Sequence, residues 1–240
     1  MSQKVQALTL VQHLEELRKR LFICIGCLLL TTIVSFAFAD LLHAILLKPA
    51  GKLELIYVTP PEAMMANLRL AFMAGLVLSM PVLLFQLLAF ITPGLHSHEK
   101  KIIIPAVLAI VVFFALGVLF AYYIAFPYAI SFFMNFTSAQ VKPMFTISNY
   151  LSFITKFLFG FGVIFELPIL FLVLGTLHLV SAAFLRKNRK YALLIIAIVS
   201  AILTPPDVVS QIMMMFPLLL LYELGIWLVV FSQRVSRRKE

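Results

Sequence analysis

Long apolar runs separated by short polar segments dominate the sequence. A helix needs about 20 mainly apolar residues to cross the roughly 30 Å of hydrocarbon in a bilayer. The pattern therefore predicts an all-α integral membrane protein with a single membrane domain over residues 1–240. We expect six transmembrane helices, at about residues 21–41, 68–91, 102–126, 152–177, 191–204 and 209–231.

The fifth run is short, because it stops at Thr204-Pro205-Pro206-Asp207. About 16 helical residues rise only ~24 Å. We therefore expect the fifth and sixth helices to be short and the bilayer to be thinned around the fifth. Pro81 and Pro168 lie inside the second and fourth runs, where proline removes a backbone hydrogen bond and favours a kink. Kinked helices predict a bent, concave bundle.

An amphipathic helix is predicted before the first span, at about residues 9–20. Leucines recur there at spacings of three and four residues, which is the periodicity of a helix with one apolar face. The polar face of this helix carries His13, Glu16 and Arg20.

Two long connections are expected on the opposite side of the membrane, near residues 42–67 and 128–150. Prolines in both segments favour turns and extended backbone. The third connection on that side, Thr204–Val208, is very short.

Composition and charge agree with a membrane protein. The chain is 63% hydrophobic and 12% charged, with a mean hydropathy of +1.08, whereas a soluble domain carries about 25% charged residues. The net charge of +9 would suggest nucleic-acid binding in a soluble protein. Here the basic residues cluster between apolar runs, so they are expected to set topology, and no nucleic-acid partner is expected.

The distribution of Lys and Arg predicts the orientation. Fourteen of them fall in the N-terminal segment, the second-to-third and fourth-to-fifth connections and the C-terminal tail, and five fall on the other side. Cytoplasmic loops carry the excess of positive charge. Both termini are therefore expected to be cytoplasmic.

Motifs for common enzyme chemistry are absent from the sequence. It holds no G-x-x-x-x-G-K-[ST] phosphate loop, no G-x-S-x-G elbow and no H-E-x-x-H zinc motif. We expect neither a catalytic site nor a cofactor or metal.

Glu166 is the most informative single residue, because it interrupts the fourth apolar run. A charge at the bilayer centre costs at least ~2.5–3.5 kcal/mol on insertion scales. Such a carboxylate either bonds to a neighbouring helix or presents a polar point to a partner or substrate. It also allows an alternative function, a proton-coupled secondary transporter of a small solute, although the chain shows no internal repeat.

Other polar residues allow both structural and functional interpretations. On the residues alone, Glu16 could pair with Arg20 four positions on, and Glu99 could favour the dipole of the third helix. Near the short outer connection, Asp207 could cap a helix. Alternatively, Thr204 and Gln211 form with it a polar patch that a partner's membrane helix reads.

Several motifs, taken in chain order, resemble the TatC family, the multispanning subunit of the twin-arginine protein translocase. The resemblance extends along nearly the whole chain. It rests on residues 13–21 (HLEELRKRL), on the segment from Phe90 to Lys101 and on three further motifs, at residues 150–153 (YLSF), 161–168 (FGVIFELP) and 203–207 (LTPPD).

The resemblance implies a receptor in the bacterial cytoplasmic (inner) membrane and not an enzyme. Members bind signal peptides of folded cargo proteins through consecutive arginines, work with the single-span subunits TatA and TatB in complexes of several copies, and draw on the proton-motive force. Membrane lipid is the remaining partner. The arginine-recognition site would comprise Glu16, Glu99, Phe90, Leu95 and His98.

The same resemblance implies roles for three further residues. Glu166 matches the family's intramembrane glutamate, and Thr204 and Gln211 fall in the docking surface for TatA or TatB helices. The chemistry of arginine agrees with the implied arginine-recognition site. Guanidinium presents planar paired donors that match a carboxylate, so lysine in the signal peptide is expected to be a poor substitute.

Overall fold

The computed structural model describes residues 10–51, 55–91, 103–134, 145–176, 179–203 and 208–237. Nearly all of these residues are helical. The helices, in chain order, are α1 (Leu10–Ala37), α2 (Ala39–Leu47), α3 (Pro60–Ile91), α4 (Ile103–Phe120), α5 (Phe126–Met134), α6 (Ile147–Phe165), α7 (Leu167–Thr176), α8 (Ala182–Lys187), α9 (Arg189–Leu203) and α10 (Val208–Arg237). A 3-10 turn (Lys48–Ala50), a π-helical turn (Ala121–Ala125) and two short strands, β1 (Leu55–Ile56) and β2 (Phe145–Thr146), complete the described chain.

Among the described residues, five helical segments are long and apolar enough to cross a membrane. They are Val11–Ala37, Pro61–Leu87, Val107–Phe132, Ile147–Thr176 and Met214–Arg234. The fifth predicted span corresponds to α9, whose 15 residues would rise only ~22 Å. The all-α membrane fold is thus confirmed, and the count of six spans stays a prediction.

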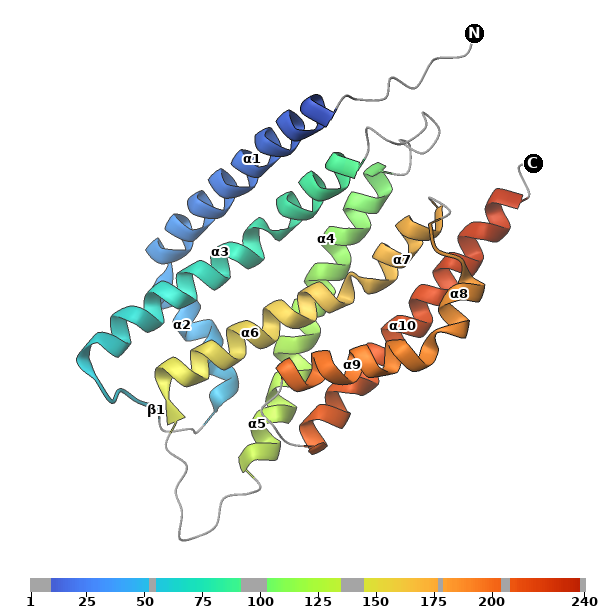
Figure 1. Cartoon of the computed structure of the whole chain (residues 1–240). Coiled ribbons are helices and arrows are strands. Elements are labelled where there is room, and N and C mark those ends of the chain that lie inside the picture. The colour runs from blue at the N-terminus through green and yellow to red at the C-terminus, as the bar shows by residue number, and fades with distance from the viewer. Residues whose placement is uncertain are drawn as a thin grey trace.

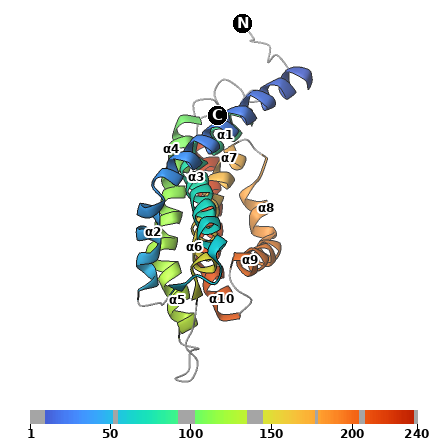
Figure 2. The same ribbon diagram turned by 90° about the vertical axis from the view of Figure 1, so that its left-hand side faces the viewer.

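The helices run between two ends of the molecule. α1 and α4 begin, and α3 and α10 end, at what we call the α1 end (Figure 1). The strands and the start of α6 lie at the opposite end, which we call the strand end (Figure 1). Seen from the side, α2, α4 and α5 lie on one side of the layer that holds α3, α6 and α10, while α8 and α9 stand on the other side (Figure 2).

The predicted amphipathic segment and first span form one continuous helix, α1, which ends at Ala37. The chain then bends at Phe38 into α2. α1 packs along α3, where Thr31 Oγ1 donates to the Gly75 carbonyl at 2.9 Å. A Cβ on Gly75 would lie 2.7 Å from the Thr32 backbone, so the missing side chain allows the two helices to approach closely.

Much of the two connections expected as loops is helical. Most of α2, the 3-10 turn and the first two turns of α3 fall within residues 42–67, and most of α5 and the start of α6 fall within 128–150. Pro60 and Pro61 occupy the first turn of α3, where a missing N–H is tolerated. The strands join the two connections by parallel pairing, with Leu55 opposite Phe145 and Ile56 opposite Thr146.

The core is centred on α6. Phe126, Phe157 and Phe161 are fully buried there. A Cβ on Gly162 would lie 2.6 Å from the Phe114 ring of α4, so α4 and α6 are in close contact. The fourth span breaks at Glu166, two residues before Pro168, as the sequence predicts. In contrast, α3 remains helical through Pro81.

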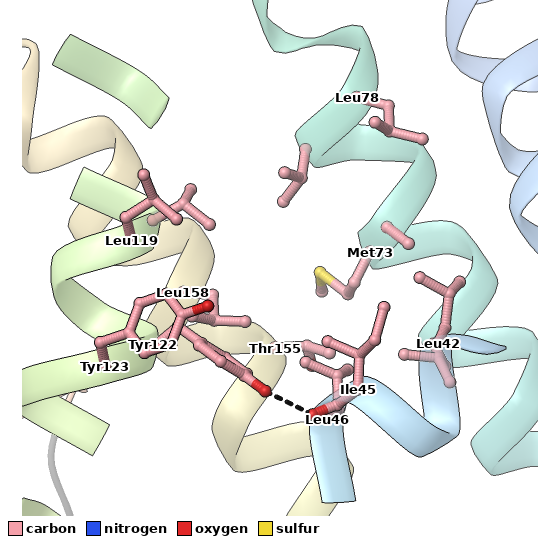
Figure 3. Close-up of a pocket in the computed structure, with 14 residues that line it drawn as sticks. Leu42, Ile45, Leu46, Met73, Leu78, Leu119, Tyr122, Tyr123, Thr155 and Leu158 are labelled. Atoms are coloured by element: carbon pink, nitrogen blue, oxygen red, sulfur yellow. Dashed lines mark hydrogen bonds between the residues drawn. The ribbon is translucent and has the colours of Figure 1, made fainter. Parts of the chain in front are cut away.

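An apolar cavity of about 320 Å³ lies among α2, α3, α6 and the π-helical turn (Figure 3). The π-helical turn brings Tyr122 and Tyr123 to its wall. Tyr122 OH donates to the Ile45 carbonyl at 2.7 Å and so links the turn to α2. This contact helps to hold α2 against the bundle.

Candidate functional site

Glu16 lies on the face of α1 that meets α3, and it already binds a guanidinium group. Arg20 donates from Nε at 3.1 Å and from Nη2 at 2.5 Å to Glu16 Oε1. Its Nη1 donates to Gln86 Oε1 of α3 at 3.0 Å. Glu16 and Arg20 remain 25% and 22% exposed, so the pair is accessible from solvent.

A hollow of about 470 Å³ surrounds this pair. Its lining residues, most of which have polar or charged side chains, come from α1 and α3: Gln12, Glu15, Glu16, Lys19, Arg20, Ile23 and Gln86. Two carboxylates and two cations therefore share one concave surface. Such a site can accept a second guanidinium if Arg20 releases Glu16.

An aromatic contact extends the site along α1. The rings of His13 and Phe90 stack with centroids 4.3 Å apart and planes at 24°. His13, Glu16 and Arg20 follow one another at helical spacing, so all three face α3. The structure thus brings Phe90 and Glu16, two of the predicted site residues, to the same α1–α3 junction.

Glu99, Leu95 and His98 lie outside the described residues, as does Thr204. The described helix ends that flank residues 92–102, those of α3 and α4, lie at the α1 end, where α1 begins (Figure 1). Sequence reasoning did not single out Gln86 or the role of His13. The sequence feature that could have pointed to Gln86 is its polar amide side chain within the second apolar run.

Glu166 lies between α6 and α7 with its side chain buried. Neither carboxylate oxygen has a hydrogen-bond partner among the described residues. The preceding residue, Phe165, packs on α4, where a Cβ on Gly117 would lie 2.8 Å from the Phe165 Cβ. One backbone hydrogen bond connects the break to α7, because Leu170 N donates to Glu166 O at 2.8 Å. Glu166 therefore sits in the bundle interior beside α4.

Gln211 links the last two helices. Its Nε2 donates to the Ala197 carbonyl of α9 at 3.0 Å. At the other end of α9, Arg189 Nη2 pairs with Glu223 Oε2 at 2.8 Å, and Tyr222 OH donates to Leu185 O at 2.8 Å. These contacts hold α8, α9 and α10 together. Within the described chain, no group of three His, Cys, Asp or Glu residues could hold a metal.

Comparison with known proteins identifies the family of this fold. Residues 12–217 match the family described as "Sec-independent protein translocase protein (TatC)". A TatC protein of Carboxydothermus hydrogenoformans is 40% identical over 227 residues, covering 93% of each chain. A TatC protein of Helicobacter pylori strain 26695 is 42% identical over 214 residues, covering 89% of this chain and 84% of its own.

Solved structures agree with the sequence relatives. A crystal structure of the twin-arginine translocase receptor TatC superposes with a TM-score of 0.82 at 37% identity, covering 92% of this chain and 99% of that one. A second, in the detergent DDM, gives 0.83 at 38% identity, covering 90% and 98%. The solute-transporter alternative finds no support among these relatives. The chain is a member of the TatC family of Sec-independent protein translocase proteins.

Proposed function

We propose that this protein is a receptor for twin-arginine signal peptides and a core subunit of a translocase that exports folded proteins using the proton-motive force. The observation that carries the proposal is the Glu16 carboxylate, which accepts two hydrogen bonds from a guanidinium inside an accessible hollow. A site that fits the guanidinium of Arg20 has the geometry to fit that of a ligand arginine.

The internal arginine sets how a ligand would bind. A signal-peptide arginine takes the place of Arg20 on Glu16, and Gln86 continues to hold Arg20 through Nη1. The exchange replaces one charge-assisted hydrogen bond with another, so the net gain comes from the second arginine and from apolar contacts near Phe90. Glu99, Leu95 and His98 complete the proposed site as the partners of the second arginine.

The proposed orientation puts the site in the cytoplasm of a bacterium, where signal peptides arrive. The basic clusters at residues 18–20 and 234–237, near the start of α1 and the end of α10, support a cytoplasmic α1 end under the positive-inside rule. α1 starts and α10 ends at that same end (Figure 1). Both termini are therefore proposed to be cytoplasmic in a multi-pass inner-membrane protein.

TatA and TatB are the proposed partners on α9 and α10. Ile195 and Ile198 of α9 are 60% and 52% exposed, which leaves an apolar helix face for a membrane helix to cover. Thr204 and Gln211 are proposed to mark the polar end of that surface. Several copies of the chain are proposed to assemble in the complex.

Peptide binding to the full-length protein in lipid nanodiscs tests the proposal. A twin-arginine peptide should bind Glu16→Gln about tenfold or more weakly than wild type, since a charge-assisted hydrogen bond contributes about 1.5–3 kcal/mol. Glu15→Gln is the matched control, because Glu15 lines the same hollow without holding Arg20. A twin-lysine peptide should bind weakly to all three proteins. Wild-type affinity in Glu16→Gln would overturn the proposal.

A further inference from the structure

A groove of about 700 Å³ opens between α3, α6 and α9, away from the Glu16 hollow. Met73 contributes from α3, and Val199, Ile202 and Leu203 contribute from α9. The remaining lining residues all belong to one face of α6. The groove lies within the membrane-spanning part of the molecule, so lipid surrounds its open side.

Polarity changes in one direction along the α6 wall. Asn149, Ser152 and Lys156 follow the strand end at spacings of three and four residues, which places them on one helix face. Phe159 and Val163 continue the same face toward the middle of the bundle. The wall is therefore polar and cationic near the strand end and apolar deeper in.

Lys156 gives the groove its charge. It is exposed on α6 and lies nine residues beyond Ile147, which is about 14 Å along the helix. None of the residues that line the groove is acidic. A lysine at this depth extends its amine along its apolar stem toward the nearer interface. The groove therefore favours an anionic ligand at its polar end.

The arrangement of the lining residues favours a phospholipid as the ligand of the groove. A lipid chain is slender and can follow the groove along its length. The order from polar to apolar also matches a phospholipid, whose headgroup stays near the interface.

We propose that this groove binds one anionic phospholipid from the leaflet at the strand end. Its phosphate lies against Lys156, with Asn149 and Ser152 as hydrogen-bond donors. One acyl chain lies along Phe159, Val163 and Ile202. The positive charge of the Lys156 amine attracts the negative charge of the phosphate. The site is independent of the Glu16 hollow and of peptide binding there.

Lipid retention by the full-length protein tests this site. Wild type and variants are reconstituted in nanodiscs of equal parts phosphatidylglycerol and phosphatidylcholine, extracted in mild detergent, and analysed by native mass spectrometry. Wild type should retain one phosphatidylglycerol in preference to phosphatidylcholine. Lys156→Gln should reduce that preference about fivefold, the effect of one basic residue near the membrane surface, and Lys156→Arg should keep it.

Two further variants separate this site from general lipid binding. Lys187→Gln removes one exposed charge outside the groove and should leave retention unchanged. Ile202→Trp places a larger side chain at an exposed position and so fills the apolar part of the groove. It should lower the retention of phosphatidylglycerol although Lys156 is intact. Equal retention of both lipids by wild type, or unchanged retention in Lys156→Gln, would overturn the proposal. So would a photo-crosslinker at position 163, on the α6 wall of the groove, that captures a protein helix and no lipid in native membranes.

Discussion

Arg20 donates two hydrogen bonds to a single oxygen of Glu16, at 2.5 and 3.1 Å. The carboxylate that is proposed to read a signal peptide is thus occupied by an arginine of its own helix. Gln86 fixes the far side of the same guanidinium at 3.0 Å. Arg20 therefore acts both as an internal competitor and as a link between α1 and α3.

The competing role of Arg20 predicts tighter peptide binding when it is removed. Arg20→Gln should raise the affinity for a twin-arginine peptide by up to about fivefold, because a partly exposed ion pair contributes about 0.2–1 kcal/mol. Isothermal titration calorimetry on the protein in nanodiscs measures the change. Salt should reduce the difference between variant and wild type, since ions screen the exposed pair.

Lys19→Gln provides the control for Arg20. Lys19 lines the same hollow, so its removal changes the local charge equally and leaves the Glu16–Arg20 pair in place. Its effect on affinity should be smaller than that of Arg20→Gln. Equal gains in the two variants would mean that general charge, and not competition for Glu16, controls binding.

The close approach of α1 and α3 predicts that Gly75 is essential to the site. In Gly75→Ala, the added Cβ would lie 2.7 Å from the Thr32 backbone, and the two helices would have to separate. Overpacking of this kind costs about 1–3 kcal/mol. Thermal unfolding in detergent should show the loss, and peptide affinity should fall because Gln86 and Phe90 move away from α1.

Gly26 offers a matched substitution on α1. A Cβ at Gly26 would meet no atom within 4 Å, so Gly26→Ala should leave peptide affinity unchanged. Alanine should also stabilise the helix by about 0.5–1 kcal/mol. A loss of stability in Gly26→Ala as large as in Gly75→Ala would contradict the packing argument.

Tyr150 is predicted to anchor α2. It is 2% exposed, and its hydroxyl donates to the Leu46 carbonyl at 2.9 Å. Tyr150→Phe keeps the ring and should cost about 0.5–1.5 kcal/mol of unfolding free energy, with faster hydrogen exchange in α2. Tyr128→Phe, at a position that is 64% exposed, should change neither quantity.

Glu166 is predicted to lower stability, since its buried carboxylate has no hydrogen-bond partner among the described residues. Glu166→Met keeps the length of the side chain and should raise the unfolding free energy by about 1–3 kcal/mol. Export of a reporter protein should fall in the same variant if the carboxylate is retained for function. For comparison, Glu223→Met breaks an exposed pair with Arg189 and should change stability by less than ~1 kcal/mol.

Apolar run length was a strong guide to the helices, because the bilayer imposes one minimum length on every span. The break beside Pro168 was also predictable, because proline acts on its own helix. The strand pair was not. Its two-residue segments, Leu55–Ile56 and Phe145–Thr146, pair across 90 positions of sequence, and neither is long enough to show a periodic pattern. Proline content favours turns at α2 and α5, but both segments are helical in the structure. Their packing against the rest of the bundle cannot be read from local sequence.

The candidate site was predictable only in part for a similar reason. Glu16 and Arg20 are four positions apart, so helix geometry alone brings them together. The Arg20–Gln86 hydrogen bond and the His13–Phe90 stack depend on how α1 docks on α3. That docking follows from a glycine contact at Gly75, whose effect appears only when both helices are in place.

The parallel pairing of β1 with β2 has a mechanical consequence for the lipid-facing groove. The pairing connects the segment before α3 to the start of α6. We therefore expect the α3 and α6 walls of the groove to move together. The third wall, α9, is tied instead to α10, through Gln211 and the Arg189–Glu223 pair. If the groove widens, we therefore expect α9 to move away from α3 and α6 together with α10.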